Sequence, residues 1–136
     1  MAYQRRILSD GTPIALGTSA SVTTVGVTSS TLDTRNYRDV EFFVKVTSKG
    51  SATLITLSIE FSSIDGAAED WADLNSESIS SGLAPQNNYQ AEFDLSSFSG
   101  AFTIAASVPT RGRYMRLQVV PDDTISGVTI TAIRRA

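Results

Sequence analysis

The chain has 136 residues, of which 41% are hydrophobic and 18% charged, and its formal net charge is −3 at pH 7. This length suits one domain with a single core, and the hydrophobic fraction is too high for a disordered chain. Because the sequence contains neither cysteine nor histidine, it excludes disulfides, thiolate chemistry, histidine-bound metals and the Ser-His and Cys-His nucleophile pairs. The composition therefore favours a domain that binds or assembles over an enzyme.

The first 38 residues carry the weakest strand signals. Residues 1–8 hold two arginines, but Ser-Asp-Gly follows where a signal peptide needs an apolar run, so we expect synthesis in a cytoplasm. No stretch approaches ~18 apolar residues, and no membrane span is expected. The β-branched content of residues 12–15 and 19–27 predicts two or three strands, the alternative being an extended N-terminal arm over residues 1–38.

Two clear strands follow, because residues 39–47 and 52–61 each put an apolar side chain at every second position. The apolar face of the first run consists of Val40, Phe42, Val44 and Val46. That of the second consists of Ile55, Leu57, Ile59 and Phe61. A Ser-Lys-Gly-Ser turn joins the two runs, so the sequence predicts that they form an antiparallel hairpin.

Residues 62–88 are the longest irregular stretch, and the pattern admits one short helical turn at residues 69–74. Alternation then returns in four further predicted strands, at residues 89–95, 101–108, 113–120 and 127–135. Seven to nine short strands separated by turns are typical of a sandwich. The prediction is an all-β, single-domain antiparallel β-sandwich or jelly roll spanning residues 1–136.

Acidic side chains gather in and after the irregular stretch. They are Asp65, Glu69, Asp70, Asp73, Glu77, Glu92 and Asp94. Two carboxylates serve a glycoside hydrolase only across a cleft, of which the sequence gives no sign. The same acids, or Asp122 and Asp123, could bind Ca²⁺ through several oxygens, but their spacing does not match an EF-hand loop. We therefore expect no catalytic residue, no metal and no cofactor.

The aromatic residues admit a second kind of site. Trp71 and Tyr89 are candidates for an aromatic patch that stacks sugar rings, with Tyr37 and Tyr114 as further members. A carbohydrate-binding module would use them in this way. The alternative is that the single tryptophan packs at the edge of the core.

Charge is distributed unevenly, since residues 65–110 hold seven acidic and no basic side chains, whereas residues 111–136 hold five arginines and two aspartates. Opposite poles suit packing against a partner or against copies of the chain. Arginine pairs well with carboxylates at interfaces. The interface candidates are Arg111, Arg113, Arg116, Arg134 and Arg135, with Asp70 and Asp73 on the acidic side. The basic residues are too few and too dispersed to predict nucleic-acid binding.

The run Arg-Tyr-Met-Arg-Leu-Gln-Val-Val at residues 113–120, followed by Gly-Val-Thr-Ile at 127–130, resembles the end of galactose-binding-like, discoidin-type jelly rolls. With the Asp-Gly at 65–66 and Trp71, residues 39–136 also resemble small bacteriophage virion proteins of β-sandwich type. The absence of cysteine and of a signal peptide favours the virion resemblance over the discoidin one.

The virion resemblance implies a capsid decoration (cement) protein, or a part of the neck or tail. Its partner would be the major capsid protein or another virion protein, and it would form a trimer or another homo-oligomer, the trimer being favoured. Our leading hypothesis from the sequence is a non-enzymatic phage capsid decoration protein located in the virion. A carbohydrate-binding module, or a tail or receptor-binding component, is the alternative.

Overall fold

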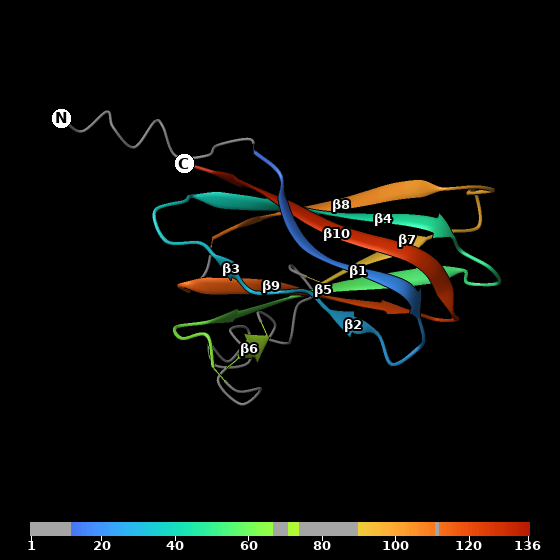
Figure 1. Ribbon diagram of the computed structural model, residues 1–136, viewed down its shortest axis with the longest axis horizontal. Coiled ribbons are helices and arrows are strands. Elements are labelled where there is room, and N and C mark those ends of the chain that lie inside the picture. The colour runs from blue at the N-terminus through green and yellow to red at the C-terminus, as the bar shows by residue number, and fades with distance from the viewer. Residues whose placement is uncertain (1–11, 67–70, 74–89, 111) are drawn as a thin grey trace, which may run out of the picture.

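Two antiparallel β-sheets face each other in the computed structural model, which describes residues 12–66, 71–73, 90–110 and 112–136 (Figure 1). Sheet A has the order β1 (Ile14–Val22), β10 (Ile125–Arg135), β4 (Asp39–Ser48) and β8 (Phe102–Pro109). In sheet B, β9 (Tyr114–Pro121) and β5 (Leu54–Ser62) are central; β2 (Val27–Thr28) and β3 (Leu32–Asp33) pair with β9, whereas β6 (Ala72–Asp73) and β7 (Gln90–Asp94) pair with β5. Within these residues, no helix is long and apolar enough to cross a membrane.

The strands follow a jelly-roll path. Strands β2 and β3 share one position beside β9, and β6 and β7 share one position beside β5, so each sheet has four positions. Between one strand position and the next along the chain, the chain crosses to the other sheet, as a double Greek key requires. The exception is the step from β5 to β6, which lie in the same sheet. The predicted fold class, an antiparallel β-sandwich or jelly roll, is confirmed.

The core lies between the sheets and is built by the alternation seen in the sequence. The inward side chains of β4 are fully buried, as are those of β5 except for Phe61, which is only partly buried. Strands β9 and β10 contribute Met115, Leu117, Val119, Val128, Ile130 and Ala132. Burying one such side chain stabilises the fold by about 1.5–3 kcal/mol, so the apolar stripes hold the two sheets together.

The hairpin predicted from residues 39–47 and 52–61 is wrong. Strand β4 pairs with β10 and β8, whereas β5 pairs with β9 and β7, so the two runs lie in opposite sheets. The connecting turn, in which the Ala52 amide donates to the Lys49 carbonyl at 2.9 Å and Ala52 itself is buried, crosses between the sheets. Alternation identifies the buried face of a strand, but it carries no information about the neighbouring strand.

The chain before β4 is part of the sandwich over its described length, because β1 lies in sheet A and both β2 and β3 lie in sheet B. The strand prediction for this segment therefore holds from residue 12 onward. The helical turn considered at residues 69–74 is wrong at Ala72 and Asp73, which pair with Phe61 and Glu60 as strand β6. Residues 69, 70 and 74 lie outside the described residues.

Candidate functional site

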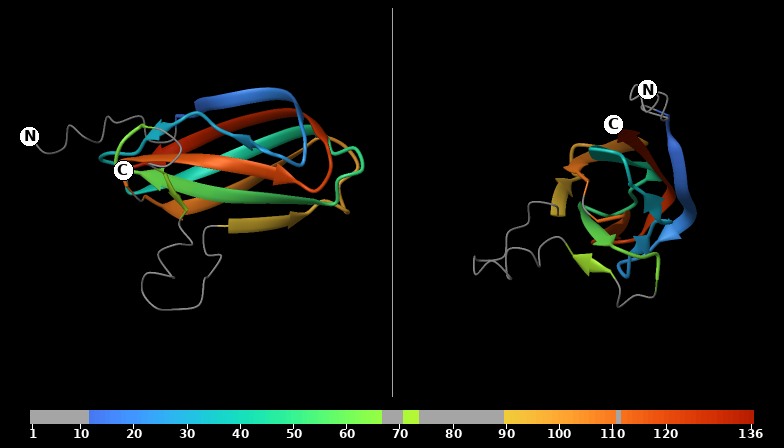
Figure 2. Two further views of the ribbon diagram at one scale, coloured as in Figure 1. Left: turned by 90° about the horizontal axis from the view of Figure 1, so that it is seen from below. Right: turned by 90° about the vertical axis from the view of Figure 1, so that its left-hand side faces the viewer.

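Five arginines meet at one end of the sandwich because of the antiparallel chain path. Strand β9 starts at Tyr114 and β10 ends at Arg135, and the turn that joins these strands lies at the opposite end. The segment from β3 to β4 crosses between the sheets at the same end, since Asp33 pairs with Tyr114 and Asp39 with Arg135. Figure 2, right, looks onto this end. The arginine end consists of Arg35, Arg38, Arg113, Arg134 and Arg135.

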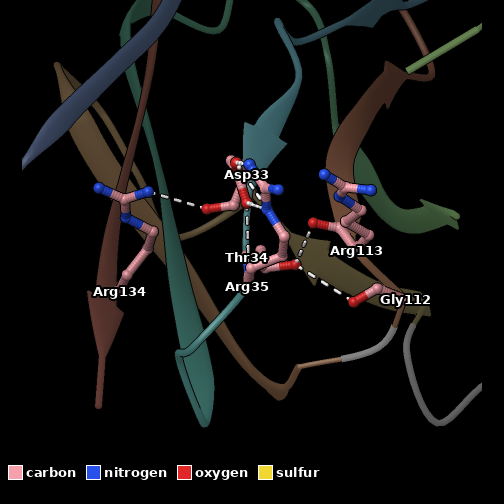
Figure 3. Close-up of polar contacts among 6 residues, drawn as sticks. All are labelled: Asp33, Thr34, Arg35, Gly112, Arg113 and Arg134. Atoms are coloured by element: carbon pink, nitrogen blue, oxygen red, sulfur yellow. Dashed lines mark hydrogen bonds and ion pairs between the residues drawn. The ribbon is translucent and has the colours of Figure 1, made fainter. Parts of the chain in front are cut away.

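Asp33 and Arg35 form the first contact of this end. The Asp33 carboxylate accepts hydrogen bonds from the Arg35 amide at 3.0 Å and from Arg35 Nε at 3.0 Å, and it also pairs with Nη2 (Figure 3). The hydrogen bond from the Arg35 side chain lowers the pKa of Asp33 below its ordinary value. Asp33 therefore stays ionised and holds the Arg35 guanidinium at a fixed position.

The loop that carries Arg35 is tied to both sheets. Thr34, which is 1% exposed, donates to the Arg113 carbonyl from its amide at 3.0 Å and from its hydroxyl at 3.1 Å. From sheet A, Arg134 Nη1 donates to the Asp33 carbonyl at 2.8 Å (Figure 3). These hydrogen bonds fasten the loop to both sheets, so the loop and the strand ends form one ordered surface.

Guanidinium groups also cover the tyrosines here. Arg134 lies 4.3 Å from the centroid of the Tyr37 ring, and Arg113 lies 5.6 Å from that of Tyr114. Such cation–π contacts contribute about 0.5–2 kcal/mol each. Tyr37, Arg134, Asp33, Arg35 and Asn36 line a hollow of about 460 Å³. In this arrangement, the tyrosine rings serve to orient arginines.

A second hollow lies at the arginine end of sheet A, where β4, β8 and β10 meet. It has a volume of about 580 Å³ and is lined by Arg38, Asp39, Ser107, Val108, Pro109 and Arg135. Arg135 Nη2 pairs with Glu41 at 2.8 Å, and this hydrogen bond is the main cause that lowers the pKa of Glu41. Arg38 is different, because its side chain is 79% exposed and its Nε lies 3.6 Å from Asp39. Arg38 thus presents its charge outward.

Arg116 lies further along β9, outside the arginine end. Its Nε donates to Glu60 Oε1 at 2.7 Å, and its guanidinium lies 4.1 Å from the centroid of the Trp71 ring. Trp71 is half-buried. The tryptophan is therefore packed against a charged pair on sheet B.

The structure brings together three of the arginines expected at an interface, namely Arg113, Arg134 and Arg135. Arg116 is set apart, and only the backbone of Asp73 is described, in β6. Arg111, Asp70 and Tyr89 lie outside the described residues. Within the described part of the chain, no three acidic side chains gather where they could hold a metal ion.

Sequence reasoning did not include Arg35 and Arg38 in this group. Both stand in the run Asp-Thr-Arg-Asn-Tyr-Arg-Asp at residues 33–39, which follows 22 residues without a charge. The change from an uncharged segment to this charged run is the signal in the sequence that points to Arg35 and Arg38. It marks the place where the chain crosses the end of the sandwich.

No protein-family model matches the sequence, and no curated protein matches it. Among solved structures, the chain is similar to one from "Structure of Triatoma Virus", with a TM-score of 0.52, 9% identity, 93% of this chain covered and 64% of that chain. It is also similar to CBM28, a carbohydrate-binding module specific for non-crystalline cellulose, with a TM-score of 0.46, 10% identity and coverages of 85% and 72%. A third similar structure, of CBM4, has a TM-score of 0.46 and 6% identity, with 96% of this chain covered and 82% of that chain.

These similarities concern the β-sandwich fold alone, because the identities are low. The chain spans just under two thirds of the length of the Triatoma virus chain. What the arginine end can do chemically follows from its own residues. Guanidinium groups in fixed orientations donate hydrogen bonds to carboxylates, so this end is suited to an acidic surface.

Proposed function

We propose that this chain is a non-enzymatic structural protein of a virus particle, and specifically a phage capsid decoration protein that assembles with its neighbours through the arginine end. The observation that carries the proposal is that both sheets supply arginines to this single end. The partner would be an acidic surface of the major capsid protein or of another virion protein. The protein's location would then be the virion.

Preorganisation supports this role. Arg35, Arg134 and Arg135 are each held by hydrogen bonds within the chain, so little side-chain entropy remains to be lost when a partner binds. Arg38 and Arg113 are exposed and can pair with carboxylates of a partner. Charge complementarity of this kind raises the association rate and selects the partner.

The test is co-sedimentation of the full chain with particles of the virus whose genome encodes it. The double substitution Arg38→Glu with Arg113→Glu should weaken binding roughly tenfold or more, because two attractive contacts become repulsive. The matched control is Lys45→Glu with Lys49→Glu, which makes the same change in net charge away from the arginine end and should leave binding within about twofold. A wild-type chain that does not bind the particles would sink the proposal, as would an equal loss in both variants.

A second candidate function is carbohydrate binding, and one observation favours it. The outer face of sheet A carries a hollow of about 330 Å³ that is lined by Phe43, Ile133, Pro13, Lys45 and three threonines, Thr103, Thr129 and Thr131. An aromatic ring flanked by hydroxyls suits a sugar ring. A glycan array separates the two functions, since Phe43→Ala should abolish glycan binding if this candidate is correct and should leave particle binding unchanged.

A further inference from the structure

The described strands leave four sheet edges, and the edges differ in how well they could accept another strand. Unpaired backbone groups at an edge are a template for a further strand, and proteins usually block them with bulges, charges or short strands. Sheet A ends in β1 on one side and β8 on the other. Sheet B ends in β2 and β3 on one side and in β6 and β7 on the other.

Each of the three edges other than β8 is interrupted by a bulge, short or charged. Strand β1 has a bulge between Ala15 and Gly17, where the register to β10 shifts. Strands β2 and β3 have two residues each, as does β6. Strand β7 has five residues and carries the exposed acids Glu92 and Asp94. A bulge, short strands and charges are the devices that prevent pairing at an edge.

Strand β8 has none of these devices before its last residue. Its eight residues pair with β4 in a continuous register from Pro109 opposite Asp39 to Phe102 opposite Val46, without a bulge. Residues 95–110 contain no charged side chain. Among the described strands β8 pairs with β4 alone, and within the described residues the backbone groups on its other side form a ladder without a partner strand. Pro109 ends this ladder at the arginine end.

We propose that β8 pairs antiparallel with β8 of a second copy of this chain, around a two-fold axis through Ala105. This pairing joins sheet A of the two copies into one continuous sheet. It concerns self-association only, and it holds whether or not the arginine end binds a virus particle. The contact is isologous, so it gives a dimer, whereas the resemblance to virion proteins implies trimers or other oligomers, the trimer being favoured.

The side chains of β8 match their own copy in this register. Thr103 stands opposite Ser107 of the second copy, and a pair of hydroxyl side chains on adjacent strands is favourable. Ala105 faces itself at the axis, and both alanines are exposed in the single chain. Because the strand has no charge, a like-with-like contact brings no repulsion. This self-complementarity is why we commit to a second copy as the occupant of the edge.

Size-exclusion chromatography with light scattering, run on the full chain over a concentration series, measures the dimer. Ala105→Lys places two ammonium groups opposite each other at the axis, so we expect the dissociation constant to rise roughly tenfold or more. The matched control is Ala20→Lys on the exposed side of β1, which should leave the dimer unchanged. Thermal denaturation shows whether each variant remains folded.

A charge-swap experiment makes the test specific for the axis. Ala105→Lys and Ala105→Glu should each form a weaker dimer alone than the wild-type chain does, and an equimolar mixture should restore the dimer, because opposite charges then face each other. A wild-type chain that stays monomeric over the whole series would overturn the proposal. It would also be overturned by a trimer, by a dimer that Ala105→Lys does not weaken, or by greater sensitivity to Ala20→Lys. None of these outcomes bears on particle binding, which is measured separately.

Discussion

Glu60 and Arg116 lie directly opposite each other on β5 and β9, joined by a 2.7 Å hydrogen bond from Arg116 Nε to Glu60 Oε1. Their side chains are only 23% and 20% exposed, and the Trp71 ring covers the guanidinium. Water screens this pair less than it screens an ordinary surface pair. The pair therefore links two central strands of sheet B and fixes the position of Trp71.

Removing the cation of this pair should destabilise the fold. Arg116→Ala leaves the Glu60 carboxylate half-buried without its partner and uncovers Trp71, so we expect a loss of about 2 kcal/mol in the free energy of unfolding. Urea denaturation measures it. The control is Arg38→Ala, whose exposed pair with Asp39 should contribute no more than about 0.5 kcal/mol. Equal losses in the two variants would contradict the role of burial.

Trp71 should act through its ring and not through its indole N–H. Its Nε1 is buried and meets no hydrogen-bond acceptor within the described part of the chain. Trp71→Phe keeps a ring beneath Arg116 and should cost about 1 kcal/mol or less, whereas Trp71→Ala should cost about 3 kcal/mol. Chemical denaturation followed by circular dichroism measures both. If Trp71→Phe lowers the free energy of unfolding as much as Trp71→Ala does, a hydrogen bond from the indole N–H contributes to stability.

The fold class could be predicted from the sequence because the alternation of apolar and polar residues directly indicates which face of a strand is buried. Val40, Phe42, Val44 and Val46 stand at every second position, and all four are fully buried. The pairing of β4 and β5 could not be predicted, since a short turn between alternating runs fits both a hairpin and a crossing between sheets. The five-residue link at 49–53 crosses between the sheets, and both neighbours of β4, namely β10 and β8, are strands distant in sequence.

The candidate site could be predicted in part for the same reason. Arg113 and Arg135 mark the beginning and the end of two consecutive strands, which places them at one end of any antiparallel pair of this kind. The contribution of Arg35 depends on the loop between β3 and β4 being fastened by Thr34 to the Arg113 carbonyl. That contact joins residues 79 positions apart, and no local sequence pattern predicts it.

Stability should fall in acid and stay constant near neutrality. The pKa values of Asp33, Glu41, Asp94 and Asp122 are all lowered, mainly by side-chain hydrogen bonds from Arg35, Arg135, Ser96 and Thr53 respectively. In each case the unfolded chain binds its proton at a higher pH than the folded chain does. The stabilisation is therefore complete above the ordinary values of 3.8 for aspartate and 4.5 for glutamate, and it is lost as pH falls through the lowered values.

Thermal denaturation between pH 2 and pH 8 measures this dependence. Because the chain has no histidine, the melting temperature should be flat from about pH 5 to pH 7 and should drop below about pH 4. Asp122→Asn removes the carboxylate that accepts hydrogen bonds from the Thr53 and Leu54 amides at 2.9 and 3.1 Å, so it should reduce the acid-induced drop. A marked change between pH 5 and pH 7 would contradict the assignment to carboxylates.

Gly127 should tolerate no side chain, although it lies inside β10. Its φ is +63°, and a Cβ at this position would lie 1.9 Å from Thr47 Oγ1 and 2.9 Å from Thr47 Cβ. The Thr47 hydroxyl occupies this space because it donates to the Ser126 carbonyl at 3.0 Å. Gly127→Ala should therefore cost about 3 kcal/mol, from the left-handed backbone and from the overlap with Thr47.

Gly100→Ala is the matched control, since a Cβ there meets nothing within 4 Å and the φ of Gly100 is outside the left-handed range. It should change the free energy of unfolding by no more than about 0.5 kcal/mol in urea denaturation. Adding Thr47→Ala to Gly127→Ala removes the hydroxyl and methyl groups that overlap, but it leaves the Thr47 Cβ and the strained φ. The double variant should thus recover only part of the loss. Full recovery would mean that the overlap with the Thr47 hydroxyl and methyl groups alone requires glycine, and no recovery would mean that the backbone conformation and the remaining Thr47 Cβ contact do.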